Sequence, residues 1–135
     1  MKDDDDNNNK RILIVDDESD ITLYFSMILR ESGFTVDVFN DSLLALSSFK
    51  EDLYDMAILD IRMPKISGLE LGTEIRKIDD KIVISFITAY DFHNQNLKEN
   101  GIAVSSMLEK EKPLIMRKPI SEKDFVSKIK EKLYR

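Results

Sequence analysis

Apolar and polar residues follow one another along this chain in blocks, and the apolar blocks are short. Five of them have the length and apolar content of β-strands: residues 12–15, 35–39, 56–59, 82–88 and 114–116. Three of these runs, 12–15, 56–59 and 82–88, are almost continuously apolar, which is typical of strands buried on both faces of a parallel sheet. The run 35–39 alternates in part, which favours a position at the edge of that sheet.

The segments between these runs have apolar residues at the three- and four-residue spacing of a helix. Ser19 or Asp20 is expected to cap the first helix, and Gly33 is expected to follow its last turn. The second helix is expected to carry its apolar residues at Leu43, Leu44, Leu46 and Phe49.

Later segments continue the same pattern. Helices are expected at 69–78 and after Ser121, and a short or irregular helix at 91–100, while the pattern of 102–112 is ambiguous. Strands and helices thus alternate along the whole chain. This alternation predicts a doubly wound α/β sheet.

Composition narrows the class of protein. The chain has 135 residues, enough for one domain, and no cysteine, which excludes disulfide bonds and thiolate metal sites. No apolar run approaches the roughly 20 residues that span a bilayer, so we expect a soluble, cytoplasmic protein without membrane contact. The formal net charge is −6 and no basic stripe is present, which argues against direct nucleic acid binding.

The first nine residues differ from the rest of the chain. Residues 1–9 contain four Asp and three Asn, and they contribute half of the net charge. Such a segment has too little apolar surface to fold. We therefore expect a disordered acidic tail at 1–9, whether native or added, and one folded domain at 10–135.

Functional side chains follow four of the five predicted strands. Asp16 and Asp17 follow the first strand, Asp60 ends the third, Thr88 ends the fourth, and Lys118 follows the fifth. The carboxyl ends of parallel strands meet at one edge of a sheet, where open α/β sheets bind their ligands. Each residue alone has an ordinary explanation as a helix cap or turn residue, but together that explanation requires four coincidences. We expect these side chains to share one pocket.

Three carboxylates in one pocket repel one another unless a cation neutralises them. A ligand set made only of oxygens, without His or Cys, favours Mg²⁺, for which Mn²⁺ can substitute. The Lys118 ammonium and the Thr88 hydroxyl add the positive charge and the hydrogen-bond donor that a phosphoryl group in transfer requires. An aspartate can itself be the nucleophile in such a reaction.

Four short motifs stand at these strand ends: Val15-Asp16-Asp17-Glu18, Asp60-Ile61-Arg62-Met63-Pro64 with Gly68, Thr88-Ala89 and Lys118-Pro119. As an ordered set they resemble the receiver domain of two-component response regulators. The resemblance extends over nearly the whole of residues 10–135. It implies a flavodoxin-like (βα)5 fold with a five-stranded parallel sheet in the order 2-1-3-4-5.

The resemblance also implies roles for the acidic residues. Asp60 is the expected phosphoacceptor, which takes the phosphoryl group from the phosphohistidine of a histidine kinase. Asp17 and Asp60 are expected to ligate Mg²⁺ together with the backbone carbonyl of Arg62. Asp16 is expected to ligate the ion directly or through water.

Further roles fall on the residues around the phosphoacceptor. Lys118 is expected to pair with Asp60 and then with the phosphoryl oxygens, and to precede a cis peptide bond to Pro119. The Thr88 hydroxyl and the Ala89 backbone N–H are expected to bind the phosphoryl group.

Two bulky residues are candidates for control of the phosphoryl lifetime. Arg62 lies two residues after the phosphoacceptor and Tyr90 two residues after Thr88. Both are expected at the approach of the hydrolytic water, although each side chain has an equally ordinary explanation as a packed surface residue.

The chain departs from the family pattern in two ways, and both departures fall on the surface that receivers normally use for output. The family usually has an aromatic residue three positions before the lysine, where this chain has Ile115. The segment between Thr88 and Lys118 is also longer than usual. Because the motifs of the site are all present, the phosphorylation chemistry is expected to be retained. The read-out of the signal is expected to be unusual, because the departures lie on the output surface.

Three functions follow from these patterns. The first is a signalling domain, not a turnover enzyme, that takes its phosphoryl group from a sensor histidine kinase or phosphotransfer protein. It would then bind a downstream protein, and it is expected to be a monomer or a weak phosphorylation-dependent dimer. The second is a phosphorylation-independent interaction module on the same fold, which Ile115 keeps open. The third is a phosphohydrolase with an aspartyl-phosphate intermediate, for which Asp16 and Glu18 have the required spacing but Asp60 has no role. The pattern fits a stand-alone receiver as well as part of a larger regulator.

Overall fold

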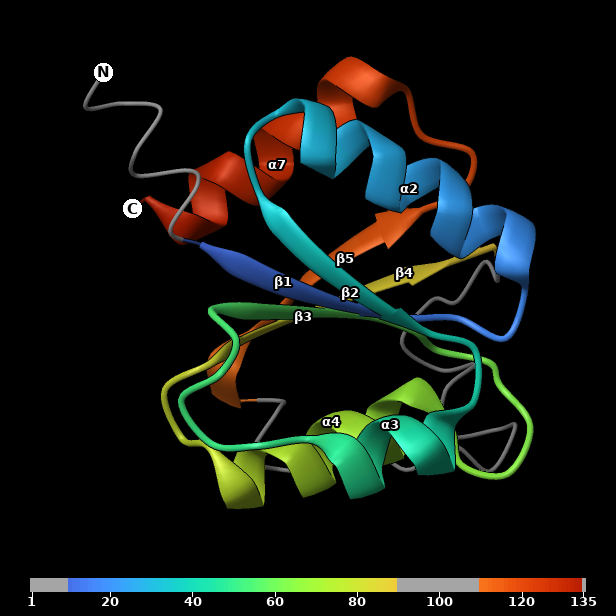
Figure 1. The fold of residues 1–135 in the computed structure, drawn as a ribbon, viewed down its shortest axis with the longest axis vertical. Coiled ribbons are helices and arrows are strands. Elements are labelled where there is room, and N and C mark those ends of the chain that lie inside the picture. The colour runs from blue at the N-terminus through green and yellow to red at the C-terminus, as the bar shows by residue number, and fades with distance from the viewer. Residues whose placement is uncertain (1–9, 90–109, 135) are drawn as a thin grey trace.

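The computed structural model describes residues 10–89 and 110–134, and within them five parallel strands form one sheet (Figure 1). The sheet order is β2-β1-β3-β4-β5, as the sequence predicts. The strands are β1 (Arg11–Val15), β2 (Thr35–Phe39), β3 (Met56–Asp60), β4 (Val83–Thr88) and β5 (Leu114–Arg117). The flavodoxin-like fold is therefore confirmed, with β2 at the edge and β3 in the centre.

Helices cover both faces of this sheet in the described part of the chain. Figure 1 shows α2 (Ser19–Glu31) and α7 (Glu122–Leu133) on one face, and α3 (Ser42–Ser48) and α4 (Gly68–Ile78) on the other. None of the described helices is both long enough and apolar enough to cross a membrane. The irregular helix expected at 91–100, and most of the ambiguous segment 102–112, lie outside the described residues.

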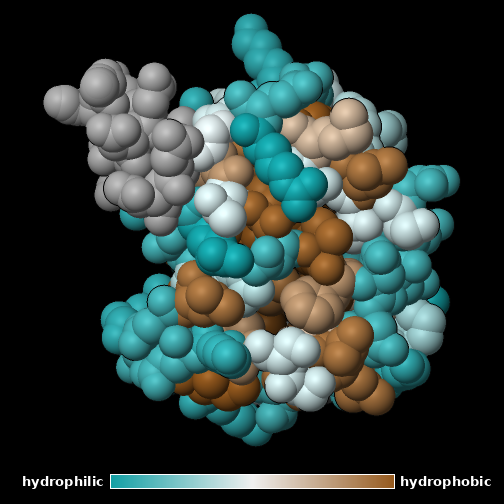
Figure 2. Space-filling view, viewed as in Figure 1, coloured by the Kyte–Doolittle hydropathy of each residue, from teal (hydrophilic) through white to brown (hydrophobic). Residues whose placement is uncertain are grey.

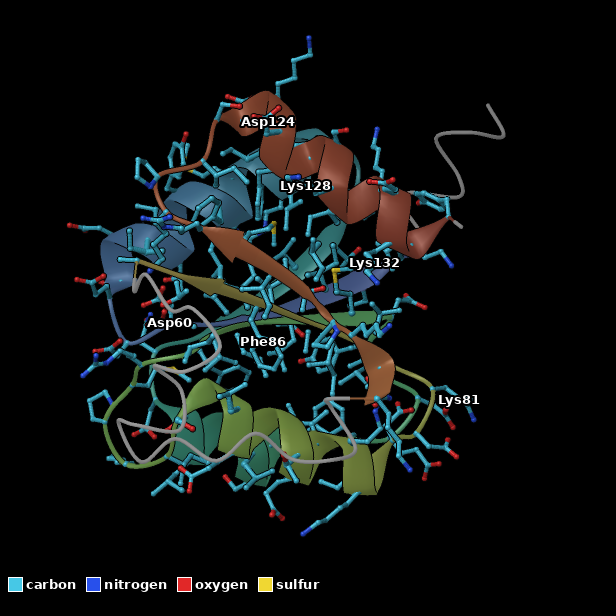
Figure 3. All side chains as sticks on the ribbon, turned by 180° about the vertical axis from the view of Figure 1, so that it is seen from behind. Asp60, Lys81, Phe86, Asp124, Lys128 and Lys132 are labelled. Atoms are coloured by element: carbon cyan, nitrogen blue, oxygen red, sulfur yellow. The ribbon has the colours of Figure 1, made fainter. Side chains whose placement is uncertain are left out.

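Apolar side chains form two cores, one on each face of the sheet. Leu59, Leu71 and Phe86 belong to the core on the side of α3 and α4, and Figure 3 shows Phe86 between the sheet and α4. On the side of α2 and α7, the rings of Phe25 and Phe125 pack with their centroids 4.4 Å apart. Every residue of β3 is buried, because this strand has both neighbouring strands and both cores around it.

The first helix begins differently from the prediction. Its N-cap is Glu18, not Ser19 or Asp20, and the Glu18 side chain makes no capping hydrogen bond. The Glu18 carbonyl accepts the backbone N–H groups of Ile21 and Thr22 instead, which starts the helix one residue earlier. Gly33 follows the helix with a φ of 99°, a left-handed conformation that glycine adopts without strain, as predicted.

Other helix ends use side chains in the usual way. Asp41 caps α3 by accepting the backbone N–H groups of Leu43 and Leu44. Ser67 and Glu70 form a reciprocal capping box at the start of α4, a motif that is present in the sequence but was not predicted. Leu43 and Leu44 are 46% and 55% exposed, and Figure 2 shows apolar side chains on this face of the molecule, over α2, β2 and α3.

The junction between β3 and α4 is unusually close. The backbone N–H of Gly68 donates to the Ile61 carbonyl at 2.8 Å. A Cβ atom at position 68 would overlap with the carbonyl oxygen of Asp60. Only glycine therefore allows α4 to begin directly against the end of β3, next to the expected phosphoacceptor.

One buried polar group in the core leads to a stability prediction. Ser85 of β4 is fully buried, and its hydroxyl has no hydrogen-bond partner among the described residues. Ser85→Ala is expected to raise the free energy of unfolding by about 1 kcal/mol, because it removes a buried hydroxyl that has lost its water. Urea denaturation of both proteins measures the difference.

Ser26→Ala provides the matched control. Ser26 is equally buried, but its hydroxyl donates to the Leu23 carbonyl at 2.9 Å, so no gain in stability is expected. A Ser85→Ala protein that is less stable than the wild type would show that the hydroxyl is satisfied in solution.

Candidate functional site

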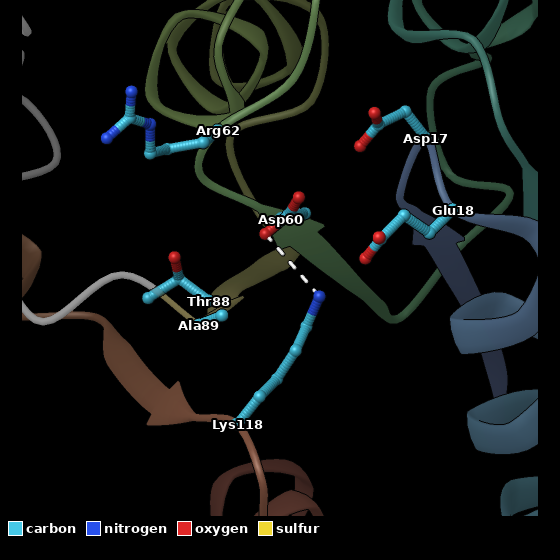
Figure 4. Close-up of a pocket in the computed structure, with 7 residues that line it drawn as sticks. All are labelled: Asp17, Glu18, Asp60, Arg62, Thr88, Ala89 and Lys118. Atoms are coloured by element: carbon cyan, nitrogen blue, oxygen red, sulfur yellow. Dashed lines mark ion pairs between the residues drawn. The ribbon is translucent and has the colours of Figure 1, made fainter.

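A hollow of about 390 Å³ lies at the carboxyl edge of the sheet (Figure 4). Its lining residues come from the ends of four elements: Asp17, Glu18, Asp60, Arg62, Thr88, Ala89 and Lys118. All of them except Glu18 are residues for which the sequence predicts a role at the site. From the sequence, Glu18 has a role only in the phosphohydrolase alternative, although its position directly after Asp17 was a usable signal for this site. Tyr90 lies outside the described residues.

Asp16 lies at the base of this site and is held firmly. It is only 1% exposed, and its backbone N–H donates to the Phe39 carbonyl at 3.1 Å. The Asn40 side-chain amide donates to the Asp16 carbonyl at 2.8 Å, and the Glu18 backbone N–H donates to Asp16 Oδ1 at 3.0 Å. The ends of β1 and β2 and the start of α2 thus fix the first carboxylate together.

Three carboxylates meet at the site as the sequence predicts. Asp16, Asp17 and Asp60 each offer an oxygen, and these oxygens lie within 4.8 Å of one another. Two oxygens bound to one Mg²⁺ or Ca²⁺ ion are at most about 4–5 Å apart, twice a metal–oxygen bond. The three residues therefore fit a single divalent ion, and their all-oxygen chemistry suits Mg²⁺ better than Zn²⁺.

Lys118 is the cation that faces these carboxylates. Its Nζ donates to Asp16 Oδ2 at 2.8 Å and lies 3.8 Å from Asp60 Oδ1, the pair marked in Figure 4. The expected ion pair of Lys118 with Asp60 is thus present, and the hydrogen bond of the Lys118 amine goes to Asp16. The Lys118 backbone N–H donates to the Thr88 carbonyl at 2.8 Å, and the peptide bond to Pro119 is cis.

Burial and negative charge shift the titration of Asp60. Burial is the larger cause and the Asp16 carboxylate the next, and together they raise the pKa of Asp60 from 3.8 to about 7. Lys118 opposes this shift, while Asp17 and Glu18 add to it. Asp60 therefore needs a further positive charge to be fully ionised at neutral pH.

The remaining lining residues surround Asp60. Thr88 is buried at the end of β4, and Figure 4 shows Thr88 and Ala89 on the side of Asp60 opposite Asp17. The Arg62 guanidinium extends away from Asp60 in the same view. An anion bound beside Asp60 would thus lie between a metal-binding side and a side with hydroxyl and backbone donors.

Comparison with known proteins gives one consistent family. The model of the response regulator receiver domain matches residues 12–130. The chain is 33% identical over 109 residues to the probable transcriptional regulator ycf29 of Porphyra purpurea, a match that covers 79% of this chain and 48% of that protein. It is 36% identical over 73 residues to the transcriptional regulatory protein CpxR homolog of Haemophilus influenzae, which covers 54% of this chain and 31% of that protein. The chain thus spans less than half the length of these two relatives.

Solved structures agree with this assignment. The response regulator protein TrrA from Thermotoga maritima, in complex with Mg²⁺ and BeF, is 34% identical with a TM-score of 0.70, over 90% of this chain and 97% of that one. A CheY-like response regulator receiver domain protein from Methanospirillum hungatei is 26% identical with a TM-score of 0.72, over 93% and 94% of the two chains. The family match over most of the chain and the shared architecture lead to one conclusion: this chain belongs to the response regulator receiver domain family.

Proposed function

We propose that Asp60 accepts a phosphoryl group from the phosphohistidine of a histidine kinase or phosphotransfer protein in a Mg²⁺-dependent reaction. The observation that carries this proposal is the position of the Asp60 carboxylate at the end of the central strand. It lies within 4.8 Å of the Asp16 and Asp17 carboxylates and 3.8 Å from the Lys118 amine. Receiver domains are signalling domains and not turnover enzymes, and the phosphorylated form would signal by binding a partner protein.

In the proposed reaction, an Asp60 carboxylate oxygen attacks phosphorus in line with the N–P bond. The O–P bond forms, the N–P bond breaks, and its electron pair stays on the imidazole nitrogen, which takes up a proton. Asp16, Asp17, Asp60 and the Arg62 backbone carbonyl would hold the ion. Bound Mg²⁺ supplies charge neutralisation, so that the carboxylate is ionised and the phosphoryl oxygens are not repelled.

The other residues of the hollow have supporting roles in the proposal. The Lys118 amine donates its hydrogen bond to Asp16 and lies 3.8 Å from Asp60. It is therefore close enough to donate to a phosphoryl oxygen on Asp60 instead. The Thr88 hydroxyl and the Ala89 backbone N–H are proposed to bind the other phosphoryl oxygens. Arg62 and Tyr90 are proposed to control the approach of the hydrolytic water.

A second candidate function has one observation in its favour. Ile115 occupies the position where the family usually has an aromatic switch residue, and it is 44% exposed on β5. A receiver without that residue can serve as an interaction module that acts independently of phosphorylation. The phosphohydrolase alternative has less support, because both Asp16 carboxylate oxygens already accept hydrogen bonds, from Glu18 and Lys118.

Acetyl phosphate and Mg²⁺ test the phosphoacceptor. The wild type is expected to gain about 80 Da, one phosphoryl group, on the peptide that contains Asp60. Asp60→Asn is expected to fold and to gain nothing, because the amide has nearly the same shape but is not a nucleophile. Mass spectrometry of the intact protein and of its peptides measures both results. An adduct of equal stoichiometry in Asp60→Asn would refute the assignment, and none in the wild type would favour the interaction module.

Thermal unfolding tests the metal site. Mg²⁺ is expected to stabilise the wild type by about 2.7 kcal/mol at a hundred times its Kd, because it binds only the folded state. Asp17→Asn is expected to lose most of this gain, since it removes a ligand. Asp80→Asn removes the same charge at the opposite end of β4 and is expected to keep the gain. If the Mg²⁺-dependent rise in Tm persists in Asp17→Asn, the ion binds elsewhere.

The raised pKa of Asp60 predicts how stability depends on pH without metal. The unfolded chain releases this proton near pH 3.8, whereas the folded protein retains it to about pH 7. The resulting stabilisation is present below pH 3.8 and is lost as the pH rises to 7. With EDTA present, the urea midpoint of the wild type is expected to fall more between about pH 5 and 7.5 than that of Asp60→Asn. Parallel curves would mean that Asp60 titrates normally.

A further inference from the structure

A fourth carboxylate lies at the site in addition to those of Asp16, Asp17 and Asp60. Glu18 lines it, and Figure 4 shows its carboxylate turned toward Asp60 and the Lys118 amine, next to Asp17. The carboxylate oxygens that lie within 4.8 Å of one another belong to Asp16, Asp17 and Asp60 and do not include one from Glu18. Glu18 is thus beside the proposed metal site but outside the set of direct ligands.

The backbone of Glu18 is held by hydrogen bonds, whereas its side-chain carboxylate makes none. The backbone N–H donates to Asp16 Oδ1 at 3.0 Å, and the backbone carbonyl accepts from Ile21 and Thr22. As N-cap of α2, the Glu18 side chain has the position from which a cap bonds backbone N–H groups, yet it makes no such bond. Within residues 10–89 and 110–134, the Glu18 carboxylate has no hydrogen bond or ion pair.

The other described helices show that this is not the general pattern of the fold. The N-cap side chains of α3, α4 and α7 all accept backbone N–H groups; they are Asp41, Ser67 and Ser121. Glutamate is a longer side chain than these, and its carboxylate extends past the helix end into the hollow. Glu18 at the start of α2 therefore lines the hollow, and its carboxylate makes no hydrogen bond to the helix end.

The coordination chemistry of Mg²⁺ provides a use for this carboxylate. Mg²⁺ takes six oxygens in an octahedron and keeps several of its waters. Three aspartates and one backbone carbonyl provide four ligands at most, so at least two positions remain for water or a phosphoryl oxygen. Bound water donates hydrogen bonds to acceptors just outside the ligand set, and such acceptors contribute to metal affinity.

We propose that Glu18 accepts hydrogen bonds from water bound to the divalent ion and thereby raises the affinity of the site for hydrated Mg²⁺. This inference rests on the proposed function, because it requires that the three aspartates bind the ion. It assigns Glu18 a positioning role toward the metal-bound water, not a role as a direct ligand or nucleophile.

Calorimetric titration with Mg²⁺ tests the proposal without any phosphorylation. Glu18→Ala is expected to raise the Kd for Mg²⁺ about tenfold, because charge and acceptor are both lost. Glu18→Gln retains an acceptor oxygen of the same reach without the charge, so its Kd is expected between those of the wild type and Glu18→Ala. Glu31→Gln, which removes the same charge at the far end of α2, is expected to bind like the wild type.

A metal-free melting curve separates this role from a structural one. Because the Glu18 side chain makes no capping bond and its charge adds to the repulsion around Asp60, Glu18→Ala is expected to have a Tm in EDTA that is no lower than that of the wild type. A lower Tm of Glu18→Ala in EDTA with an unchanged Kd would overturn the proposal and indicate a structural role. An equal loss of affinity in Glu31→Gln would also overturn it, because net charge alone would then be sufficient.

The outcomes also separate this inference from the proposed function. If the wild type binds no Mg²⁺, the proposed function fails and the inference fails with it. If Asp17→Asn lowers the affinity and Glu18→Ala does not, the metal site stands and only the role of Glu18 is refuted.

Discussion

The buried hydrogen-bonded ion pair between Lys118 and Asp16 joins the last strand to the first across the width of β3 and β4. Both side chains are largely shielded from water, with 12% and 1% exposed. A buried charge without a partner is strongly destabilising. When no metal ion is bound, Asp16 and Lys118 therefore each need the charge of the other. The pair also keeps a positive charge 3.8 Å from Asp60. The positions of the strand ends at the carboxyl edge therefore depend on the balance between the carboxylates and the Lys118 ammonium at the site.

That balance makes the metal and the reactivity of Asp60 interdependent. Four carboxylates face or underlie the hollow, and Lys118 is hydrogen-bonded to the most buried of them. Without a further cation, the pKa of Asp60 is about 7, which leaves much of it protonated near neutral pH. A protonated carboxyl group is a poor nucleophile. In the proposed function, a divalent ion would thus bring the phosphoacceptor into its reactive form as well as bind the incoming phosphoryl group.

The sequence was sufficient for the sheet and for most of the site, because both follow from one rule: parallel strands bring their carboxyl ends to one edge. The rule places Asp16, Asp60 and Lys118 together from the sequence alone. It does not give side-chain directions, so the hydrogen bond of Lys118 to Asp16 and the direction of Glu18 were not predicted. The N-cap of α2 was misassigned because short polar residues are the usual caps, whereas here the backbone of a glutamate begins the helix.

The contact between Gly68 and the Asp60 carbonyl has a mechanical consequence. With no side chain between them, the end of β3 and the first turn of α4 are in direct backbone contact, and the Gly68 N–H is bonded to Ile61. The seven residues between Asp60 and Gly68 form a closed loop whose two ends are fixed to each other. A displacement of the Asp60 backbone would therefore also displace the start of α4, so that a change at the Asp60 carboxylate reaches this helix through two backbone segments in direct contact.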